Sequence, residues 1–190
     1  PVGVFGPAEG DDPYVYALFP HKSLESVATL TQKLGSDPAF REAGADFLSA
    51  PKKDPAYARF ESSLLLAFDD HPRLAVPSKK DSRVFQLRIY ESHSTERGQK
   101  KIEMFNQGGE IDIFHKVGLN PVFFGEALVG SKLPNLTYML GFDNEDAMKA
   151  AWDAFLAHPD WDKLKKDEQY KDTVSNITNI VLRPLACSQI

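Results

Sequence analysis

The same order of predicted secondary-structure elements occurs twice in the chain, and this repetition restricts the possible folds more than any other feature. Around Pro121–Trp161, and again near the start, the pattern is strand, loop, strand and helix. Three pairs of residues are each 121 positions apart without a gap: Pro13 and Pro134, Pro38 and Pro159, and Phe40 and Trp161. A long self-similar period is informative about architecture. The sequence therefore predicts an internal duplication.

The chain has 190 residues, so two units of about 95 residues would each have a marginal core unless they packed on each other. We expect a first repeat over residues 1–77 and a second over 83–190, sharing a core, with the linker in the loop 69–81. The second repeat carries a strand and helix over 84–118 that the first lacks. Either the duplication is incomplete or the true N-terminus is missing from this sequence. We favour the second explanation, under which a targeting segment could be missing as well.

Composition excludes several classes of protein. The net charge is −5, with Lys and Arg scattered among acids, so no DNA or RNA partner is expected. The longest apolar runs, 64–68 and 121–124, are strand-length and far short of the roughly 20 residues that a membrane span needs. The single cysteine, Cys187, excludes an internal disulfide framework and a thiolate metal cluster. This favours a reducing compartment, and we expect a cytoplasmic location unless a targeting segment is missing.

The secondary structure follows from periodicity and from capping residues. Strands are predicted at 2–5, 14–19, 62–68, 84–91 and 175–183, with a further pair around Phe124 and Tyr138. Helices are predicted over 24–34, after Asp37, after Ser94 or Thr95, over 111–117 up to Gly118, after Asn144 and after Asp160. In the strand 84–91, period-two alternation places Arg88 and Tyr90 on one face and Phe85 and Leu87 on the other. We expect helices on the Phe85 face and none on the Arg88 face.

The complete repeat reads strand, helix, strand, strand, helix, strand, which is the ferredoxin-like split βαβ arrangement of the α+β class. Its helices cover one face of the sheet, and aromatic side chains on the other face would form an exposed apolar patch. Two such sheets packed face to face form a dimeric α/β barrel, and two fused units can supply both halves. The outer strands and helix faces, such as the face carrying Trp161 and Leu164, predict a homo-oligomer with two-fold symmetry.

An ordered set of short motifs resembles one known family. The set comprises Arg83–Glu91, Gly109–Phe114, Gly118-Leu119-x-Pro121, Leu136–Tyr138 and His158–Trp161 after the helix with Trp152. Together these are similar to the NIPSNAP family, clearly over 83–190 and more weakly over 2–77. The resemblance implies the dimeric α/β-barrel fold. It implies no catalytic residues, and animal members are linked to mitochondria and to protein interaction. Barrel relatives include haem-degrading and quinol monooxygenases and isomerases, but that likeness concerns fold only.

Five residues are candidates for a ligand site: Arg88, Tyr90, Tyr138, Asn179 and His115. A guanidinium such as that of Arg88 binds a carboxylate with two parallel donors. The alternative is that Arg88 pairs with a structural acid, either Glu91 or Glu126.

His115 follows Asp112 by three residues on one helical face, where a carboxylate can set the tautomer of a histidine. The alternative is a histidine that interacts with the helix dipole. The histidine and acid spacings match no metal site, and no glycine-rich loop links a strand to a helix, so we predict no metal and no cofactor.

Three functions stay open on these grounds. The first is small-molecule binding in the barrel interior by these candidates. The second is a non-catalytic interaction or structural role. The third is a cofactor-independent enzyme of the monooxygenase or isomerase kind.

Overall fold

The computed structural model describes residues 1–10 and 13–190, which divide into two compact units. The sheet unit comprises Pro1–Leu18 and Ser63–Ile190, and the helical unit comprises Phe19–Ser62. These boundaries separate the chain by contacts and do not coincide with the repeats 1–77 and 83–190. The division into repeats therefore stays a prediction.

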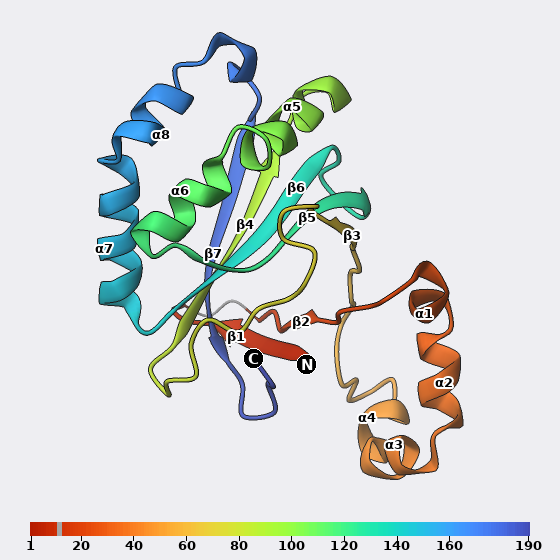
Figure 1. Ribbon diagram of the computed structural model, residues 1–190. Helices are drawn as coiled ribbons and strands as arrows, with labels where there is room; N and C mark the ends of the chain where they lie inside the picture. Colours follow the sequence, from red (N-terminus) through yellow and green to blue (C-terminus); the bar gives the residue numbers. More distant parts are fainter. Residues whose placement is uncertain (11–12) are drawn as a thin grey trace. The chain divides into compact units, whose positions relative to one another are not determined.

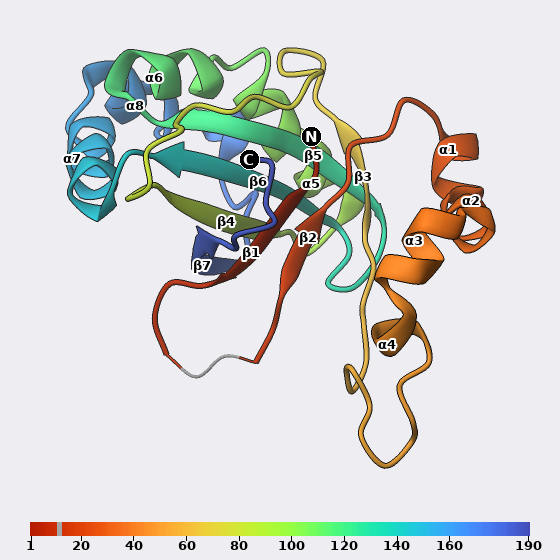
Figure 2. The same cartoon turned by 90° about the horizontal axis from the view of Figure 1, so that it is seen from below.

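The sheet unit has a mixed α/β fold built on one curled antiparallel sheet (Figures 1 and 2). Its strands are β1 (Gly3–Pro7), β2 (Tyr16–Leu18), β3 (Leu64–Ala67), β4 (Val84–Glu91), β5 (Asn120–Val129), β6 (Asn135–Phe142) and β7 (Asn176–Pro184). Their order is β2-β1-β7-β4-β6-β5-β3. The predicted strand over 84–91 has the predicted bounds, and the other predicted strands occur within a few residues of theirs.

The strands contributed by residues 1–77 extend this sheet at both of its edges. Strands β1 and β2 lie beyond β7, and β3 pairs with β5. We expected the two repeats to form separate sheets packed face to face, but the described strands all belong to a single sheet. The strands of residues 1–77 therefore form backbone hydrogen bonds with the edges of the C-terminal strands, and they do not form a second sheet that packs on the first.

Helices α5 (Thr95–Phe105), α6 (Glu110–Val117), α7 (Glu145–Leu156) and α8 (Pro159–Leu164) cover one face of the sheet (Figure 1), and a 3-10 turn, η1 (Glu168–Tyr170), follows them. The side chains of Ser94 and Asn144 cap α5 and α7 as predicted. Gly118 ends α6 with a φ of 83°, a left-handed conformation that glycine adopts without strain. The aromatic core beneath these helices includes Phe105, Phe114, Phe124, Tyr138 and Phe155.

The assignment of the strand faces was wrong. Gln86, Arg88 and Tyr90 lie on the face that the helices cover, since Trp152 of α7 donates a hydrogen bond of 2.6 Å to Gln86 and the rings of Tyr90 and Phe105 of α5 are 6.2 Å apart. Phe85 belongs to the cluster on the opposite face. Alternation identifies the residues that share a face of the strand. It cannot identify the face that the helices cover, because here the helices carry polar and aromatic side chains that contact the polar and aromatic residues of the strand.

The opposite face of the sheet carries a second apolar cluster. Its buried members are Phe5, Phe85, Val122, Met139, Leu182 and Ile190, and Leu74 and Val76 of the loop after β3 pack against them. Leu87, Phe123 and Ile180 are only partly buried there. The inner side of the curled sheet is therefore filled with side chains where the loop and the C-terminal residue reach it.

The helical unit consists of α1 (Leu24–Ala28), α2 (Leu30–Ser36), α3 (Pro38–Ala43) and α4 (Ala45–Leu48). The single helix predicted over 24–34 is divided after Ala28, where the hydroxyl of Thr29 bonds back to the carbonyl of Glu25, an arrangement that disturbs helices. None of these four helices contains a buried residue. Of the helices that the structure describes, none has the length and apolar character required to cross a membrane.

Candidate functional site

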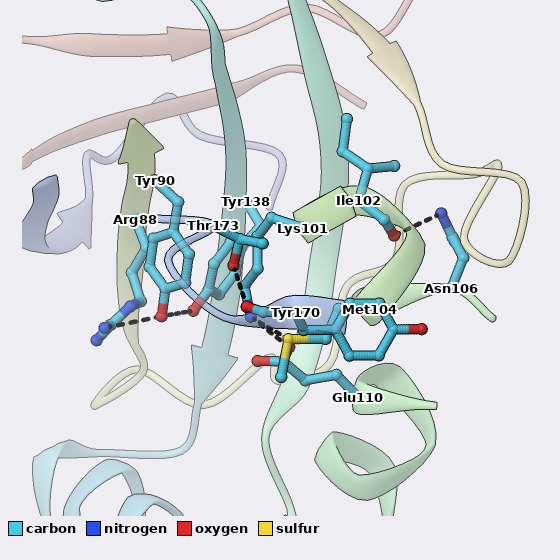
Figure 3. Close-up of polar contacts among 10 residues, drawn as sticks. All are labelled: Arg88, Tyr90, Lys101, Ile102, Met104, Asn106, Glu110, Tyr138, Tyr170 and Thr173. Carbon is cyan, nitrogen blue, oxygen red and sulfur yellow. Dashed lines mark hydrogen bonds and ion pairs between the residues drawn. The ribbon is translucent and has the colours of Figure 1, made fainter. Parts of the chain in front are cut away.

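Arg88 lies in the middle of β4, half-buried under α7. Its Nη2 donates a hydrogen bond of 3.0 Å to the hydroxyl of Tyr90 (Figure 3). The guanidinium carbon is 4.6 Å from the ring centroid of Trp152 and 5.3 Å from that of Tyr90, so the cation interacts with both aromatic faces. The Nε atom is buried and has no hydrogen-bond partner. The side chain is thus held by rings, with part of its donor capacity unused.

The acids that we considered as partners of Arg88 bind elsewhere. Glu91 accepts a hydrogen bond from Asn176 at 2.7 Å and lies 3.5 Å from the ammonium of Lys132. Glu126 accepts from Gln99. Across residues 1–10 and 13–190, Arg88 has no ion pair with a carboxylate. A charged group in this position is normally paired with an opposite charge when buried, so the lack of a carboxylate partner among the described residues makes Arg88 a candidate for binding an external anion.

Tyr90 and Tyr138 form the floor of this site. Arg88 of β4 lies opposite Tyr138 of β6 in the strand register. The hydroxyl of Tyr138 donates a hydrogen bond of 3.0 Å to the hydroxyl of Tyr90 (Figure 3). Burial raises the pKa of Tyr138 well above its ordinary value. Burial would lower the pKa of Arg88, but the two phenol groups more than offset this, and the net change is upward. At neutral pH the site therefore holds the cation of Arg88 beside the neutral phenol of Tyr138.

A buried ion pair lies next to the tyrosines. Lys101 Nζ of α5 is 2.6 Å from Glu110 Oε2 of α6, and the two side chains are only 5% and 2% exposed. The ammonium also contacts Met104 Sδ at 3.2 Å and lies 4.6 Å from the ring centroid of Phe105. Burial raises the pKa of Glu110 above its ordinary value, although the positive charges of Lys101 and Arg88 act in the opposite direction.

Sequence reasoning missed this pair and the role of Trp152. Lysine and glutamate are exposed by default, and the one available signal was that Lys101 precedes the buried Phe105 by four residues, on the same helical face. In the sequence, Trp152 stands out only as part of the family motif. It does pack against the core, but its ring also covers the guanidinium of Arg88.

The two remaining candidates are Asn179 of β7 and His115 of α6. Asn179 of β7 is directly opposite Arg88 in the register, so both side chains leave the same face of the sheet, and Asn179 is exposed. His115 is exposed in the last turn of α6, and within the described part of the chain it does not hydrogen-bond Asp112. It lies near His71, whose pKa is lowered by burial first and by the charge of His115 to a smaller extent. Their roles in binding stay predictions.

No group of three or more His, Cys, Asp or Glu side chains that could hold a metal ion occurs among the residues that the structure describes.

Comparison with known proteins agrees with the motifs. The model of the NIPSNAP family matches residues 85–189. An uncharacterised NIPSNAP-like domain protein from Burkholderia xenovorans has a similar solved structure, with a TM-score of 0.51 and 19% identity over 58% of this chain and 91% of that one. A NIPSNAP family protein from Agrobacterium tumefaciens strain C58 has a TM-score of 0.49 and 16% identity over 57% and 98% of the two chains. No curated protein matches the sequence. At 19% identity, the likeness to the Burkholderia xenovorans structure concerns the fold alone.

Proposed function

The chain belongs to the NIPSNAP family, and from this premise we propose that it binds a small anionic molecule at Arg88, beneath α7. The observation that carries the proposal is the half-buried guanidinium that has no carboxylate partner among the described residues and keeps a buried Nε without an acceptor. A planar anion such as a carboxylate can accept two parallel hydrogen bonds from a guanidinium. Asn179, opposite Arg88 in the register, adds a neutral amide at the exposed side.

This site differs from the one first expected. The barrel interior was the expected place for a ligand, but Arg88 and the two tyrosines belong to the helix-covered face. The inner face carries the apolar cluster around Phe85 and Leu182. The proposed ligand therefore combines an anionic group, which faces Arg88, with a flat apolar part that can lie against Trp152. Tyr138 is unsuited to act as a general base near neutral pH, because burial raises its pKa.

We also propose that the curled sheet derives from two tandem ferredoxin-like units and completes a dimeric α/β barrel. Two findings support this. The order β7-β4-β6-β5 is that of a split βαβ unit, and α3 and α8 have bounds that differ by the same 121 residues as the sequence repeat. Two-fold self-association stays a prediction.

Calorimetric titration with benzoate, and with benzamide as its neutral isostere, tests the anion site. We expect benzoate to bind and benzamide not to, and Arg88→Lys to weaken benzoate binding by more than tenfold, because lysine keeps the charge and loses the planar fork. Arg183→Lys is the matched control, since Arg183 also lies on a strand but already pairs with Glu145.

Melting temperatures recorded beside the titrations separate binding from folding. Equal binding of benzoate and benzamide would contradict the proposal. So would full affinity in Arg88→Lys with an unchanged melting temperature, because Arg88 would then be a structural cation only. Absence of benzoate binding at millimolar concentration would likewise count against it.

A further inference from the structure

Among the residues that the structure describes, two charged side chains are buried, and both lie beside the proposed anion site. They are Lys101 of α5 and Glu110 of α6, whose charged atoms are 2.6 Å apart. Removing two charges from water is unfavourable, and a buried ion pair often stabilises a fold no better than apolar residues of the same volume. Stability alone therefore does not account for this pair, and its position points to a role in the neighbouring site.

The ring of Tyr90 lies close to two cations. Its centroid is 5.3 Å from the guanidinium carbon of Arg88 and 5.7 Å from Nζ of Lys101. Figure 3 shows Tyr90 and Tyr138 between Arg88 and the pair of Lys101 and Glu110. Two positive charges so close together repel each other, and the repulsion is stronger inside a protein than in water. Glu110 offsets the charge of Lys101, so the positive charge of Arg88 is the one that stays unbalanced.

The charge balance of this cluster limits the charge of its ligand. Arg88 and Lys101 are cations and Glu110 is an anion, so the three side chains sum to one positive charge. The ion pair of Arg183 with Glu145 is partly exposed, so it is screened by water and salt and as a pair adds no net charge. A ligand with one negative charge would neutralise the cluster. A ligand with two would leave a negative charge uncompensated on the side of the sheet that carries Glu110, which is unfavourable where water is excluded.

We infer that Glu110 determines the charge of the ligand at Arg88, and that this ligand is a monoanion such as a carboxylate and not a dianion such as a phosphate monoester. Glu110 acts through its charge, because its carboxylate is bonded to Lys101 and, within the described residues, forms no ion pair with Arg88. It is therefore a specificity-determining residue that does not touch the ligand. The inference rests on the anion site proposed above and adds to it the ligand charge and the residue that selects it.

Calorimetric titrations with benzoate and with phenyl phosphate test the inference at about pH 8, where a phosphate monoester carries two negative charges. The wild type is expected to bind benzoate more tightly than phenyl phosphate. Glu110→Gln keeps the shape of the side chain and removes its charge, so it should strengthen benzoate binding by about threefold and phenyl phosphate binding by more. Glu103→Gln is the matched control, since Glu103 also pairs with a lysine but is partly exposed, and it should leave both affinities unchanged.

The double variant Lys101→Met, Glu110→Leu separates charge from packing. It removes both charges of the pair and leaves the net charge of the cluster unchanged, so it should bind both ligands as the wild type does. If the pair only maintained the shape of the site, Glu110→Gln and the double variant would both bind benzoate more weakly. Melting temperatures recorded beside the titrations identify any variant that does not fold, and the comparison of the two ligands in the wild type requires no variant.

Three results would overturn the inference. The first is tighter binding of phenyl phosphate than of benzoate by the wild type. The second is benzoate binding that is unchanged or weaker in a folded Glu110→Gln variant. The third is loss of benzoate binding in a folded double variant. Failure of the anion site itself has a different signature, because benzoate would then not bind to the wild type at all.

Discussion

At the scale of single residues, the helix-covered side of the sheet is a polar arrangement inside an aromatic core. Arg88, Tyr90 and Tyr138 are joined by hydroxyl hydrogen bonds, and the ion pair of Lys101 and Glu110 lies beside them. Removing water from charged groups is unfavourable, and only close pairing compensates for it. The aromatic rings that exclude water are therefore also what make each polar contact in this region strong.

Replacing one member of the buried ion pair is expected to destabilise the protein strongly. Lys101→Met should lower the free energy of unfolding by about 3–5 kcal/mol, because Glu110 is left as an uncompensated buried charge. The double variant Lys101→Met, Glu110→Leu should recover most of the loss. Urea unfolding followed by circular dichroism measures both, and Lys100→Met is the control, since its ion pair with Glu103 is partly exposed. A double variant as unstable as the single one would contradict this account.

The sign of the pH dependence follows from the raised pKa of Glu110. A carboxyl whose pKa is higher in the folded state than in the unfolded state stabilises the fold at pH values below its unfolded-state pKa, near 4.5. This stabilisation is lost as the pH rises through the folded-state pKa. The Lys101→Met variant is therefore expected to lose stability, relative to the wild type, as pH rises from the ordinary range of glutamate towards neutrality.

At the scale of secondary-structure elements, equivalent helices in the two halves have similar caps and different packing. Asn144 accepts a hydrogen bond from the amide of Ala147 at the start of α7, and Ser23, 121 residues earlier, accepts from Ser26 at the start of α1. Helix α7 contributes Ala151 and Phe155 to a core, whereas α1 buries nothing. Local capping rules act on both helices, and only one of them is tied to tertiary packing.

This difference predicts unequal effects of removing the two caps. Asn144→Ala should lower the free energy of unfolding by about 1 kcal/mol, because α7 packs on the sheet and unfolds with it. Ser23→Ala should leave the urea transition unchanged and speed hydrogen exchange in α1 alone. The urea midpoint and site-resolved exchange distinguish these outcomes. An equal fall in the midpoint for both variants would show that α1 is coupled to global unfolding.

At the scale of the whole molecule, the stabilising contacts are concentrated in the sheet unit. It holds both apolar clusters, while the helices of the helical unit contain no buried residue. Regions with few buried apolar contacts open locally at low free-energy cost.

Limited proteolysis should therefore begin in the helical unit. We expect trypsin to cut first at Lys52 or Lys53, in the exposed loop after α4, and to leave Lys101 intact, as measured by mass spectrometry of the early fragments. Early cleavage at Lys101 would contradict the assignment of the stable unit.

The sequence by itself determined most elements of the fold, because their signals are local. The alternation in Val84–Glu91 predicted a strand with the observed bounds, and Ser94 and Asn144 marked helix starts through hydrogen bonds that span three residues. The motifs also identified the family correctly. Arg88, Tyr90 and Tyr138 were chosen by shared faces and side-chain chemistry, and the structure brings them together.

Only the tertiary structure decided which face the helices cover, how the strands of residues 1–77 join the sheet, and which charges are buried. Each of these depends on contacts between segments far apart in the chain. Trp152 meets Gln86 across 66 residues, and β1 pairs with β7 from the other end of the chain. Lys101 and Glu110 are nine residues apart, and the rings of Tyr90 and Phe105 lie against the ammonium of this buried pair. Periodicity specifies which side chains point the same way, and packing alone determines what they meet.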